Sequence, residues 1–360
     1  MSLNKSLLPH RVHETGKVFI GNLALESGQE LEEVELAYER CGAEGAPAIL
    51  ICHALTGNQY TVGTDQEPGW WHGLIGVNKA IDLNNYQVVT FNVLGGCNGS
   101  TGPLSINPST GEKYRTKFPK ITIRDIVNAQ RKALENLEID ALLAVIGGSL
   151  GGMQALEWGL LYPSFVEKII VLAATSQLSD YGIAFNTIGT TAIENDPGWK
   201  GGYYTQPEDV KGLEVARIAG MVTYRSPYLF DQRFQRKEKE NSTFEVESYL
   251  KYQGEKLTRR FDPNSYLYLL QAMNSHDIGR GRGGIEEAAH SYKPEVIGIG
   301  FQHDLIYPPN KIKEFTERTP RGTYYYIPTQ FGHDGFLVEF ERWASLLSSH
   351  LADHTRQREA

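Results

Sequence analysis

The chain has 360 residues, of which 41% are hydrophobic and 22% charged, a composition typical of a globular protein. This composition excludes disordered, collagen-like and disulfide-scaffold proteins, and the length allows about two domains or one core with an insertion. The formal net charge of -8 disfavours broad contact with nucleic acid or with anionic membranes.

The three cysteines and the amino-terminal residues indicate where the protein works. Cys41, Cys52 and Cys97 are scattered without C-x-x-C spacing, so neither a disulfide framework nor a zinc site is expected. Residues 1–17 contain no unbroken apolar segment of the length that a signal peptide needs, and no later run is long enough to cross a membrane. We therefore expect a cytoplasmic protein that binds no membrane.

Short apolar runs rich in Ile and Val alternate with helical patterns along the first half of the chain and again near its end. Such runs are typical of buried strands in a sheet that is covered on both faces, and their alternation with helices predicts a mostly parallel α/β sheet. The predicted strands are 48–52, 87–93, 142–146, 168–172, 296–301 and 323–327, and the predicted helices are 123–137 and 153–161.

The pattern of strands stops after Ala174. Residues 176–290 are helical, aromatic and charged, and they contain no convincing parallel strand. We predict an α/β core made of residues 1–175 and 291–360, with residues 176–290 inserted as a helical lid. The charged run 236–240 is expected to be a solvated helix face.

Residues 142–156 contain a serine among four glycines, directly after a predicted strand. Gly147-Gly148-Ser149-Leu150-Gly151 matches the G-x-S-x-G pattern, in which a strained turn between strand and helix exposes a nucleophilic serine. The helix that follows would stabilise negative charge at its N-terminus. A phosphate loop would need a lysine that is missing here, whereas a structural glycine turn remains an alternative that only partner residues can decide.

Two later strand ends supply the partners that a nucleophilic serine requires. A serine needs a histidine to accept its proton and an acid to orient that histidine. Where the serine stands on such a strand-to-helix turn of an α/β sheet, the three residues follow one another in the chain order Ser, acid, His. Asp304 follows strand 296–301, and His333 follows the last strand in a glycine-flanked loop. The backbone N–H of Leu150 is one expected oxyanion donor, and the loop after strand 48–52 would supply the other.

Five motifs together resemble the homoserine O-acetyltransferase family of the α/β-hydrolase fold. The resemblance spans nearly the whole chain, and the motifs are His53–Asn58, Asn92–Pro103, Gly147–Trp158, Thr223–Ser226 and Gly332–Leu337. It implies an α/β-hydrolase fold with helices on both faces of the sheet, and it favours the N–H of Leu55 as the second oxyanion donor.

The same resemblance implies a reaction and its substrates. Ser149 would take the acetyl group of acetyl-CoA, and His333 would then activate the hydroxyl of L-homoserine, in a step of methionine biosynthesis. Acetyl-CoA would be a co-substrate, no metal or permanently bound cofactor would be needed, and the lid would form a homodimer contact. Arg225 would bind the homoserine carboxylate, Asp334 its ammonium group, and Tyr224 would lie near the substrate.

Alternatives remain for the acyl donor, the acceptor and the class of protein. Relatives that use succinyl-CoA tend to carry arginine two residues after the catalytic aspartate, where this chain has Ile306. An apolar residue cannot compensate a buried carboxylate, so acetyl-CoA is favoured. L-serine remains a possible acceptor. The other readings are an esterase or thioesterase, and a non-catalytic ligand-binding member of the fold.

Overall fold

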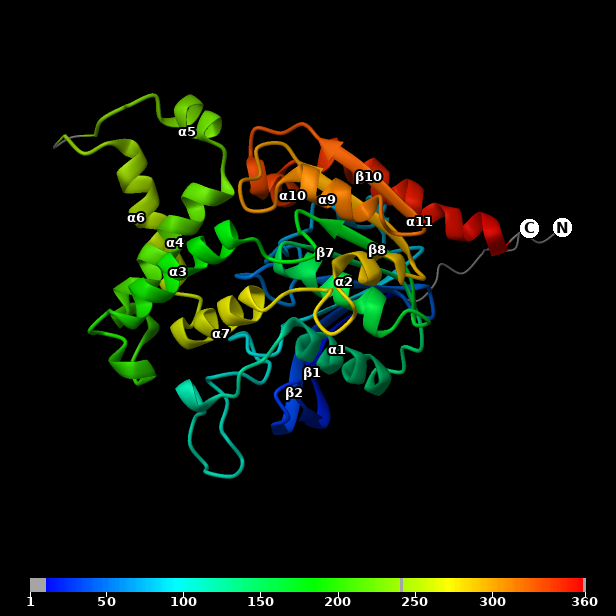
Figure 1. Cartoon of the computed structure of the whole chain (residues 1–360), viewed down its shortest axis with the longest axis horizontal. Helices are drawn as coiled ribbons and strands as arrows, with labels where there is room; N and C mark the ends of the chain where they lie inside the picture. Colours follow the sequence, from blue (N-terminus) through cyan, green and yellow to red (C-terminus); the bar gives the residue numbers. More distant parts are fainter. Residues whose placement is uncertain (1–10, 240–241, 359–360) are drawn as a thin grey trace.

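A computed structural model describes residues 11–239 and 242–358, and its centre is an eight-stranded sheet (Figure 1). The strands are ordered β1-β2-β6-β3-β7-β8-β9-β10. The two strands at one edge, β1 and β2, pair antiparallel, and every pair from β6 to β10 is parallel. The sheet strands are β1 (Arg11–Ala24), β2 (Glu30–Ala43), β3 (Ala48–Cys52), β6 (Gln87–Phe91), β7 (Leu142–Gly148), β8 (Val166–Leu172), β9 (Glu295–Phe301) and β10 (Gly322–Ile327).

Helices cover both faces of this sheet, as the continuous apolar strands require. Along β3, Leu50 packs into one core and its neighbours Ile49 and Ile51 pack into the other. The first core contains side chains of α1 (Ile123–Asn136), α2 (Leu150–Leu161), α8 (Ile285–His290) and α9 (Pro309–Thr316). The second contains those of α10 (Gly335–Val338), α11 (Ala344–Arg358) and the small sheet of β4 (Ile75–Gly76) and β5 (Ile81–Asp82). The predicted mostly parallel α/β sheet is confirmed.

Between β8 and β9 the chain forms a lobe of helices beside the sheet, on the left of Figure 1. It contains α3 (Asp180–Glu194), α4 (Lys211–Tyr224), α5 (Pro227–Phe234), α6 (Glu245–Thr258) and α7 (Pro263–Asn274). The predicted division into a core and a lid, with boundaries at 176 and 290, stays a prediction. Among the described residues, no helix is both long and apolar enough to span a membrane.

The expectation that residues 236–240 form a helix face was wrong for the part that the structure describes. Helix α5 ends at Phe234, and its C-cap residue Gln235 adopts the left-handed conformation with φ 48°. The following residues form a turn and a β-bridge between Glu238 and Phe244, although they are exposed as expected. Residue 240 lies outside the described residues. Charge alternation alone predicts solvent exposure but not helix, because it contains no apolar periodicity.

The carboxyl ends of the parallel strands meet at one edge of the sheet. Leu55 follows β3, Ser149 follows β7, Asp304 follows β9 and His333 follows β10. Because parallel strands point the same way, four residues far apart in sequence are brought to this edge, where α/β folds bind their ligands.

Candidate active site

Ser149 stands at the turn between β7 and α2. Its backbone has φ 57° and ψ -123°, a left-handed conformation that costs energy for a residue with a side chain and that is typical of a nucleophile elbow. The glycine at 151 permits this turn, because a Cβ there would lie 2.0 Å from the carbonyl oxygen of Cys52 on β3. The serine side chain is left at the N-terminus of α2, and only 6% of the residue is exposed to solvent.

Asp304 and His333 form a buried hydrogen-bonded pair. The distance between Asp304 Oδ2 and His333 Nδ1 is 2.8 Å, and the side chains are 0% and 5% exposed. The other carboxylate oxygen, Oδ1, accepts hydrogen bonds from the backbone N–H groups of Ile306 at 3.0 Å and Tyr307 at 2.9 Å. These contacts fix the carboxylate, so Nδ1 of the imidazole carries the proton and Nε2 is left as the base.

Two opposing effects act on the His333 imidazole. Burial disfavours the charged ring and lowers its pKa, whereas the charge and hydrogen bond of Asp304 and the charge of Asp334 raise it. The net result is a pKa above the ordinary value of 6.5. The ring is therefore a stronger base than free histidine, which suits a group that must take a proton from a hydroxyl.

Aromatic side chains connect His333 with the neighbourhood of Ser149. The rings of Tyr307 and Tyr224 lie 5.2 and 5.6 Å from the His333 ring, centre to centre, and both tyrosines line a cavity together with Ser149. Burial raises the pKa of Tyr307, and the Ser149 hydroxyl beside it offsets this in part. Within the described residues no hydrogen bond joins Ser149 to His333. Such contacts are often long without substrate and shorten in the reacting complex.

The two expected oxyanion donors lie at the right ends of their elements. Leu150 is the first residue of α2, where a backbone N–H has no partner within the helix. Leu55 lies in the loop after β3 and lines the same cavity as Ser149. No hydrogen bond from either N–H to another described residue is present, so both remain available to a ligand.

His53 holds the loop that contains Leu55. Its Nδ1 lies 2.8 Å from the Ala54 carbonyl oxygen, and its Nε2 accepts a hydrogen bond from the backbone N–H of Val93 at 3.1 Å. Burial lowers the pKa of this imidazole to about 4, so it is neutral. Burial also raises the pKa of the adjacent Cys52 thiol. A neutral, hydrogen-bonded ring beside a protonated thiol indicates a structural role for both residues.

The cavity beside Ser149 is narrow, with a volume of about 30 Å³, and is lined without any Lys, Arg, Asp or Glu. Ile306 is among its lining residues and is 8% exposed. Most of the remaining lining is apolar and comes from the helical lobe: Leu178, Phe185, Ala216, Ala219, Leu270 and Met273. The cavity therefore offers an uncharged site of modest polarity next to the serine.

Arg225 and Asp334 do not line this cavity, although Arg225 is next to Tyr224, which does. Arg225 Nε is 3.0 Å from Asp334 Oδ2, and the side chains are 18% and 14% exposed. Asp334 directly follows His333, and Arg225 directly follows Tyr224 at the end of α4. The two residues that sequence assigned to opposite charges of one substrate are thus paired with each other, while both terminal nitrogens of Arg225 have no hydrogen-bond partner among the described residues.

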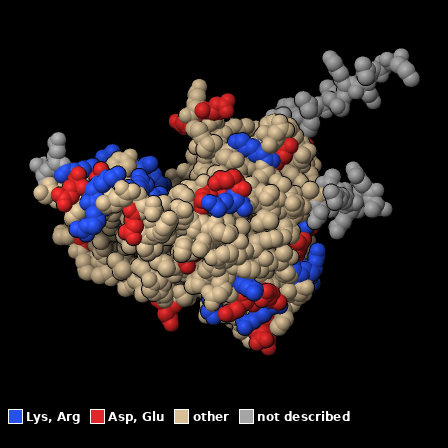
Figure 2. All heavy atoms as spheres, turned by 90° about the horizontal axis from the view of Figure 1, so that it is seen from above, with Lys and Arg blue, Asp and Glu red and all other residues tan. Residues whose placement is uncertain are grey.

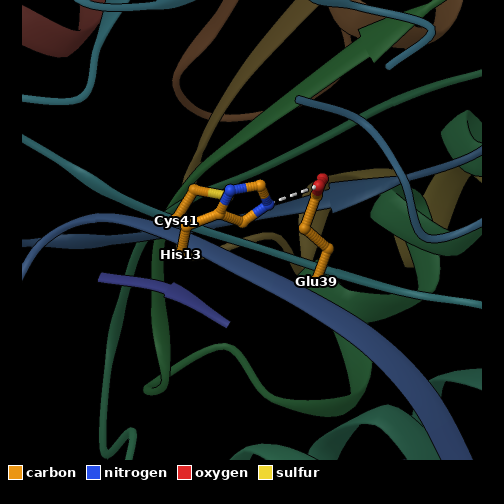
Figure 3. Close-up of side chains that lie close together, drawn as sticks. All are labelled: His13, Glu39 and Cys41. Carbon is orange, nitrogen blue, oxygen red and sulfur yellow. Dashed lines mark hydrogen bonds and ion pairs between the residues drawn. The ribbon is translucent and has the colours of Figure 1, made fainter. Parts of the chain in front are cut away.

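A second cluster, on the antiparallel strands β1 and β2, has metal-ligand residue types. Figure 3 shows the His13 ring facing the Glu39 carboxylate, with Cys41 beside it, and the three ligand atoms lie within 4.8 Å of one another. Glu39 already accepts hydrogen bonds at 2.8 Å from the backbone N–H groups of Val62 and Gly63. Burial raises the pKa of the Cys41 thiol, which disfavours the thiolate that a metal needs. Glu39 therefore fastens loop 62–63 to the sheet.

Comparisons with known proteins agree with this geometry. The family model of the alpha/beta hydrolase fold matches residues 47–340. A homoserine O-acetyltransferase from Carboxydothermus hydrogenoformans is 44% identical over 359 residues, covering 94% of this chain and 95% of that protein. The chain belongs to the homoserine O-acetyltransferase family. The predicted α/β-hydrolase fold and the resemblance found from five motifs are both confirmed.

Two solved structures show how widely this family's fold is used. The crystal structure of homoserine O-acetyltransferase from Bacillus anthracis has a TM-score of 0.88 and 29% identity, covering 94% of this chain and 98% of that one. Esterase E22 has a TM-score of 0.87 and 27% identity, covering 94% of this chain and all of that one. The backbone is thus shared between a protein named as a transferase and one named as an esterase.

Sequence reasoning missed two residues that shape the site of this family member. Tyr307 lies between His333 and the Ser149 cavity, yet it reads in sequence as one of 19 tyrosines. Phe336 packs against the His333 ring at 5.4 Å, and a Cβ at Gly148 would lie 2.4 Å from it. The only available signal was the position of each residue three places after Asp304 or His333.

Proposed function

We propose that the protein is a homoserine O-acetyltransferase, which moves the acetyl group of acetyl-CoA to the hydroxyl of L-homoserine through an acetyl-serine intermediate. The observation that carries this proposal is the buried Asp304–His333 pair, set at the sheet edge where the strained Ser149 turn also lies, in a chain 44% identical to a protein named for this activity. No permanently bound cofactor is needed. Acetyl-CoA is a co-substrate.

In the first half-reaction Ser149 Oγ attacks the thioester carbonyl carbon while His333 Nε2 takes the hydroxyl proton. The carbonyl oxygen becomes an oxyanion, which accepts hydrogen bonds from the N–H groups of Leu55 and Leu150. When the tetrahedral intermediate collapses, the carbon–sulfur bond breaks and the CoA sulfur takes the proton from the imidazolium. The products are free CoA thiol and acetyl-Ser149.

The second half-reaction uses the same groups in reverse order. His333 takes the proton of the homoserine hydroxyl, whose oxygen attacks the acetyl carbon, and the imidazolium then returns a proton to Ser149. Asp304 orients the ring and stabilises its charge throughout. The raised pKa of His333 supports this role because both steps place a positive charge on the ring.

Arg225 and Asp334 are our candidates for holding the amino-acid part of the acceptor. The free terminal nitrogens of Arg225 suit two parallel hydrogen bonds to a carboxylate, and the remaining oxygen of Asp334 suits an ammonium group. Their mutual ion pair keeps both charges in place when the substrate is absent. Tyr224 lies between this pair and Ser149, so it is the side chain that the carbon chain of the acceptor would contact.

The lining of the Ser149 cavity supports acetyl rather than succinyl as the acyl group. Ile306 lines it, and no lining residue is charged, so a succinyl carboxylate would be buried without a counter-ion. Burial of such a charge is expensive. Between homoserine and serine as acceptor, one methylene is worth only about 1–3 kcal/mol, so homoserine is proposed from the family relationship.

The proposed function also includes the pathway and compartment of the reaction, the role of the lid and the oligomeric state of the protein. The reaction belongs to methionine biosynthesis, in the cytoplasm, with no nucleic-acid or membrane partner. Residues 176–290 act as a lid over Ser149, since helices α3, α4 and α7 of this segment supply most of the cavity lining. The lid is also the proposed contact of a homodimer.

Acetyl ester hydrolysis is the second candidate, favoured by the similarity to esterase E22. Water would then replace homoserine in the second half-reaction. The paired Arg225 and Asp334 argue for the transferase, because a simple ester offers neither a carboxylate nor an ammonium group for them to bind.

The decisive experiment follows thiol release from acetyl-CoA with and without L-homoserine. A transferase releases thiol rapidly only when homoserine is present, and it forms O-acetylhomoserine in equal amount. Equal rates without homoserine would establish hydrolysis instead. Ser149→Ala should abolish both reactions while the thermal unfolding curve stays that of a folded protein, and activity near wild type would remove Ser149 from its proposed role.

A further inference from the structure

The cavity beside Ser149 contains few side chains that could donate a hydrogen bond to a reacting oxygen atom. Lys, Arg, Asp and Glu side chains gather in patches on the face that Figure 2 shows, but none of these residue types lines this cavity. Besides Ser149 itself, the described residues that line it with an oxygen or nitrogen in the side chain are Asn186, Thr223, Tyr224, Tyr266 and Tyr307. A side-chain donor to the reacting oxygens must come from this set.

Four of these five side chains already have a hydrogen-bond partner within the protein. The Asn186 amide donates a hydrogen bond at 2.7 Å to another asparagine of the helical lobe, and the Thr223 hydroxyl donates one at 2.9 Å to a carbonyl oxygen one turn earlier in α4. The hydroxyls of Tyr224 and Tyr266 are hydrogen-bonded to each other. The hydroxyl of Tyr307 makes no hydrogen bond of ordinary geometry to any described residue, although the residue is only 1% exposed.

Tyr307 is in contact with each member of the candidate triad. Its backbone N–H donates a hydrogen bond at 2.9 Å to the Asp304 carboxylate, and its ring centre lies 5.2 Å from that of His333. Its hydroxyl lies close enough to Ser149 that the serine hydroxyl offsets part of the rise in the tyrosine pKa that burial causes. Burying a hydroxyl without a partner costs free energy, so a partner that is present only during the reaction would explain its position.

We propose that Tyr307 is a further catalytic residue, whose hydroxyl donates a hydrogen bond to Ser149 Oγ when that oxygen carries negative charge. Charge develops on Oγ when it attacks the acyl carbon while His333 removes its proton, and again when it leaves that carbon in the second half-reaction. A donor fixed beside the oxygen stabilises both transition states.

The phenol acts only as a donor in this arrangement. Burial raises the pKa of Tyr307, so its proton stays in place, and protons still pass only between Ser149, His333 and the substrates. The inference rests on the proposed function, because it takes Ser149 as the nucleophile of an acyl transfer, and it adds a group that acts on the serine oxygen itself.

Tyr307→Phe tests this role, because it removes the hydroxyl and keeps the ring. Rapid mixing with acetyl-CoA gives the rate at which acetyl-Ser149 forms, and adding L-homoserine to the isolated acetyl-enzyme gives the rate at which it breaks down. Both rates should fall at least about tenfold, as expected for loss of a hydrogen bond to a charged oxygen. Since transfer and hydrolysis share this oxygen, the ratio of O-acetylhomoserine to acetate should stay at the wild-type value. The unfolding temperature should not fall, since the hydroxyl has no partner to lose.

Tyr292→Phe is the matched control. Tyr292 is 3% exposed, donates a hydrogen bond at 2.9 Å to the carbonyl oxygen of Leu156 and does not line the Ser149 cavity. This variant should have a lower unfolding temperature and wild-type rates of acetyl-Ser149 formation and breakdown, which is the opposite of the result expected for Tyr307→Phe.

Wild-type rates in Tyr307→Phe would overturn the proposal. A loss confined to transfer, with hydrolysis unchanged, would also overturn it, because the hydroxyl would then act on the acceptor and not on Ser149 Oγ. The proposed function fails in a different way. A wild type that releases thiol equally fast with and without L-homoserine would refute the transferase, while the rate of acetyl-Ser149 formation would still decide the role of Tyr307.

Discussion

Replacing Asp304 by asparagine removes one charge at the candidate site while it leaves the shape of the side chain unchanged. The asparagine carbonyl oxygen can still accept the backbone N–H groups of Ile306 and Tyr307, now at 3.0 and 2.9 Å from Oδ1. The amide nitrogen then replaces Oδ2, which lies 2.8 Å from His333 Nδ1. Because an amide N–H is a donor, it forces Nδ1 to become an acceptor and moves the ring proton to Nε2.

A proton on Nε2 prevents the ring from acting as a base toward Ser149. In serine proteases the equivalent change lowers turnover about 10⁴-fold, which corresponds to about 5.5 kcal/mol of lost transition-state stabilisation. The Asp304–His333 contact here is short and buried, and two backbone N–H groups support the acid. We therefore expect a loss of about 10³- to 10⁴-fold in kcat with acetyl-CoA and homoserine.

The same substitution should move the pH dependence of activity. Burial lowers the pKa of His333, and the Asp304 carboxylate reverses this to a pKa above 6.5. The neutral ring is the active base, so wild-type kcat/KM should fall as pH decreases through a midpoint above 6.5. Without the carboxylate the effect of burial prevails, and the midpoint of the residual activity should shift to lower pH.

Thiol release measured from pH 5 to 9, together with thermal unfolding, checks both expectations. The unfolding temperature of the variant controls for misfolding, and Asp304→Ala shows what removal of the backbone contacts adds. A loss of less than tenfold in a folded variant, or a midpoint that does not move, would contradict the assignment of Asp304 as the acid that orients His333.

Three further substitutions test the supports of the site and of the sheet. Gly151→Ala should lower both thermal stability and activity, since its methyl group would sit 2.0 Å from a backbone carbonyl oxygen, and a variant as stable and active as wild type in melting and thiol-release assays would contradict the tight turn. Glu157→Gln should lower the free energy of unfolding by more than about 2 kcal/mol in urea titration, because Glu157 is 2% exposed and pairs with Arg282 at 2.7 Å, and a smaller effect would show that solvent replaces the pair. The hydrogen bond from His350, with Lys168 in support and burial opposing, lowers the pKa of Glu295 to about 2. The stability that this carboxylate contributes should be fully present above pH 4.5 and vanish by about pH 2, so the difference in unfolding temperature between wild type and Glu295→Gln should close over that range.

The sheet and the order of the site residues could be predicted because they depend on local patterns. The apolar run 142–146 followed by glycines indicated both β7 and the Ser149 turn, and strand order then placed Asp304 and His333 at the same edge. The predicted helix 153–161 lacked the first turn of α2, because Gly151 and Gly152 have low helix propensity. In the structure tertiary contacts outweigh this low propensity, and both glycines are helical.

Features that depend on contacts between distant residues could not be predicted. Nothing local in His53 reveals that its Nε2 accepts a hydrogen bond from Val93, 40 residues later. The recess lined by Arg217 of α4, Lys256 of α6 and Trp70 joins segments far apart in the chain, so no motif contains it. Sequence placed Arg225 and Asp334 near one substrate but gave no sign of their ion pair, because nothing in the pattern sets the distance between them.

The uncharged cavity beside Ser149 affects the lifetime of a loaded serine more than its rate of formation. No charged side chain of its lining could activate a water molecule toward an ester carbonyl, so we expect an acyl group stored there to decay slowly until an amino alcohol arrives. A few side chains of the cavity wall then decide whether the acyl group passes to the amino alcohol or to water. Ser149, Asp304 and His333 can be the same in both cases. A backbone shared with an esterase is then what one would expect, since replacing a few wall residues would change the outcome of the reaction without altering its chemistry.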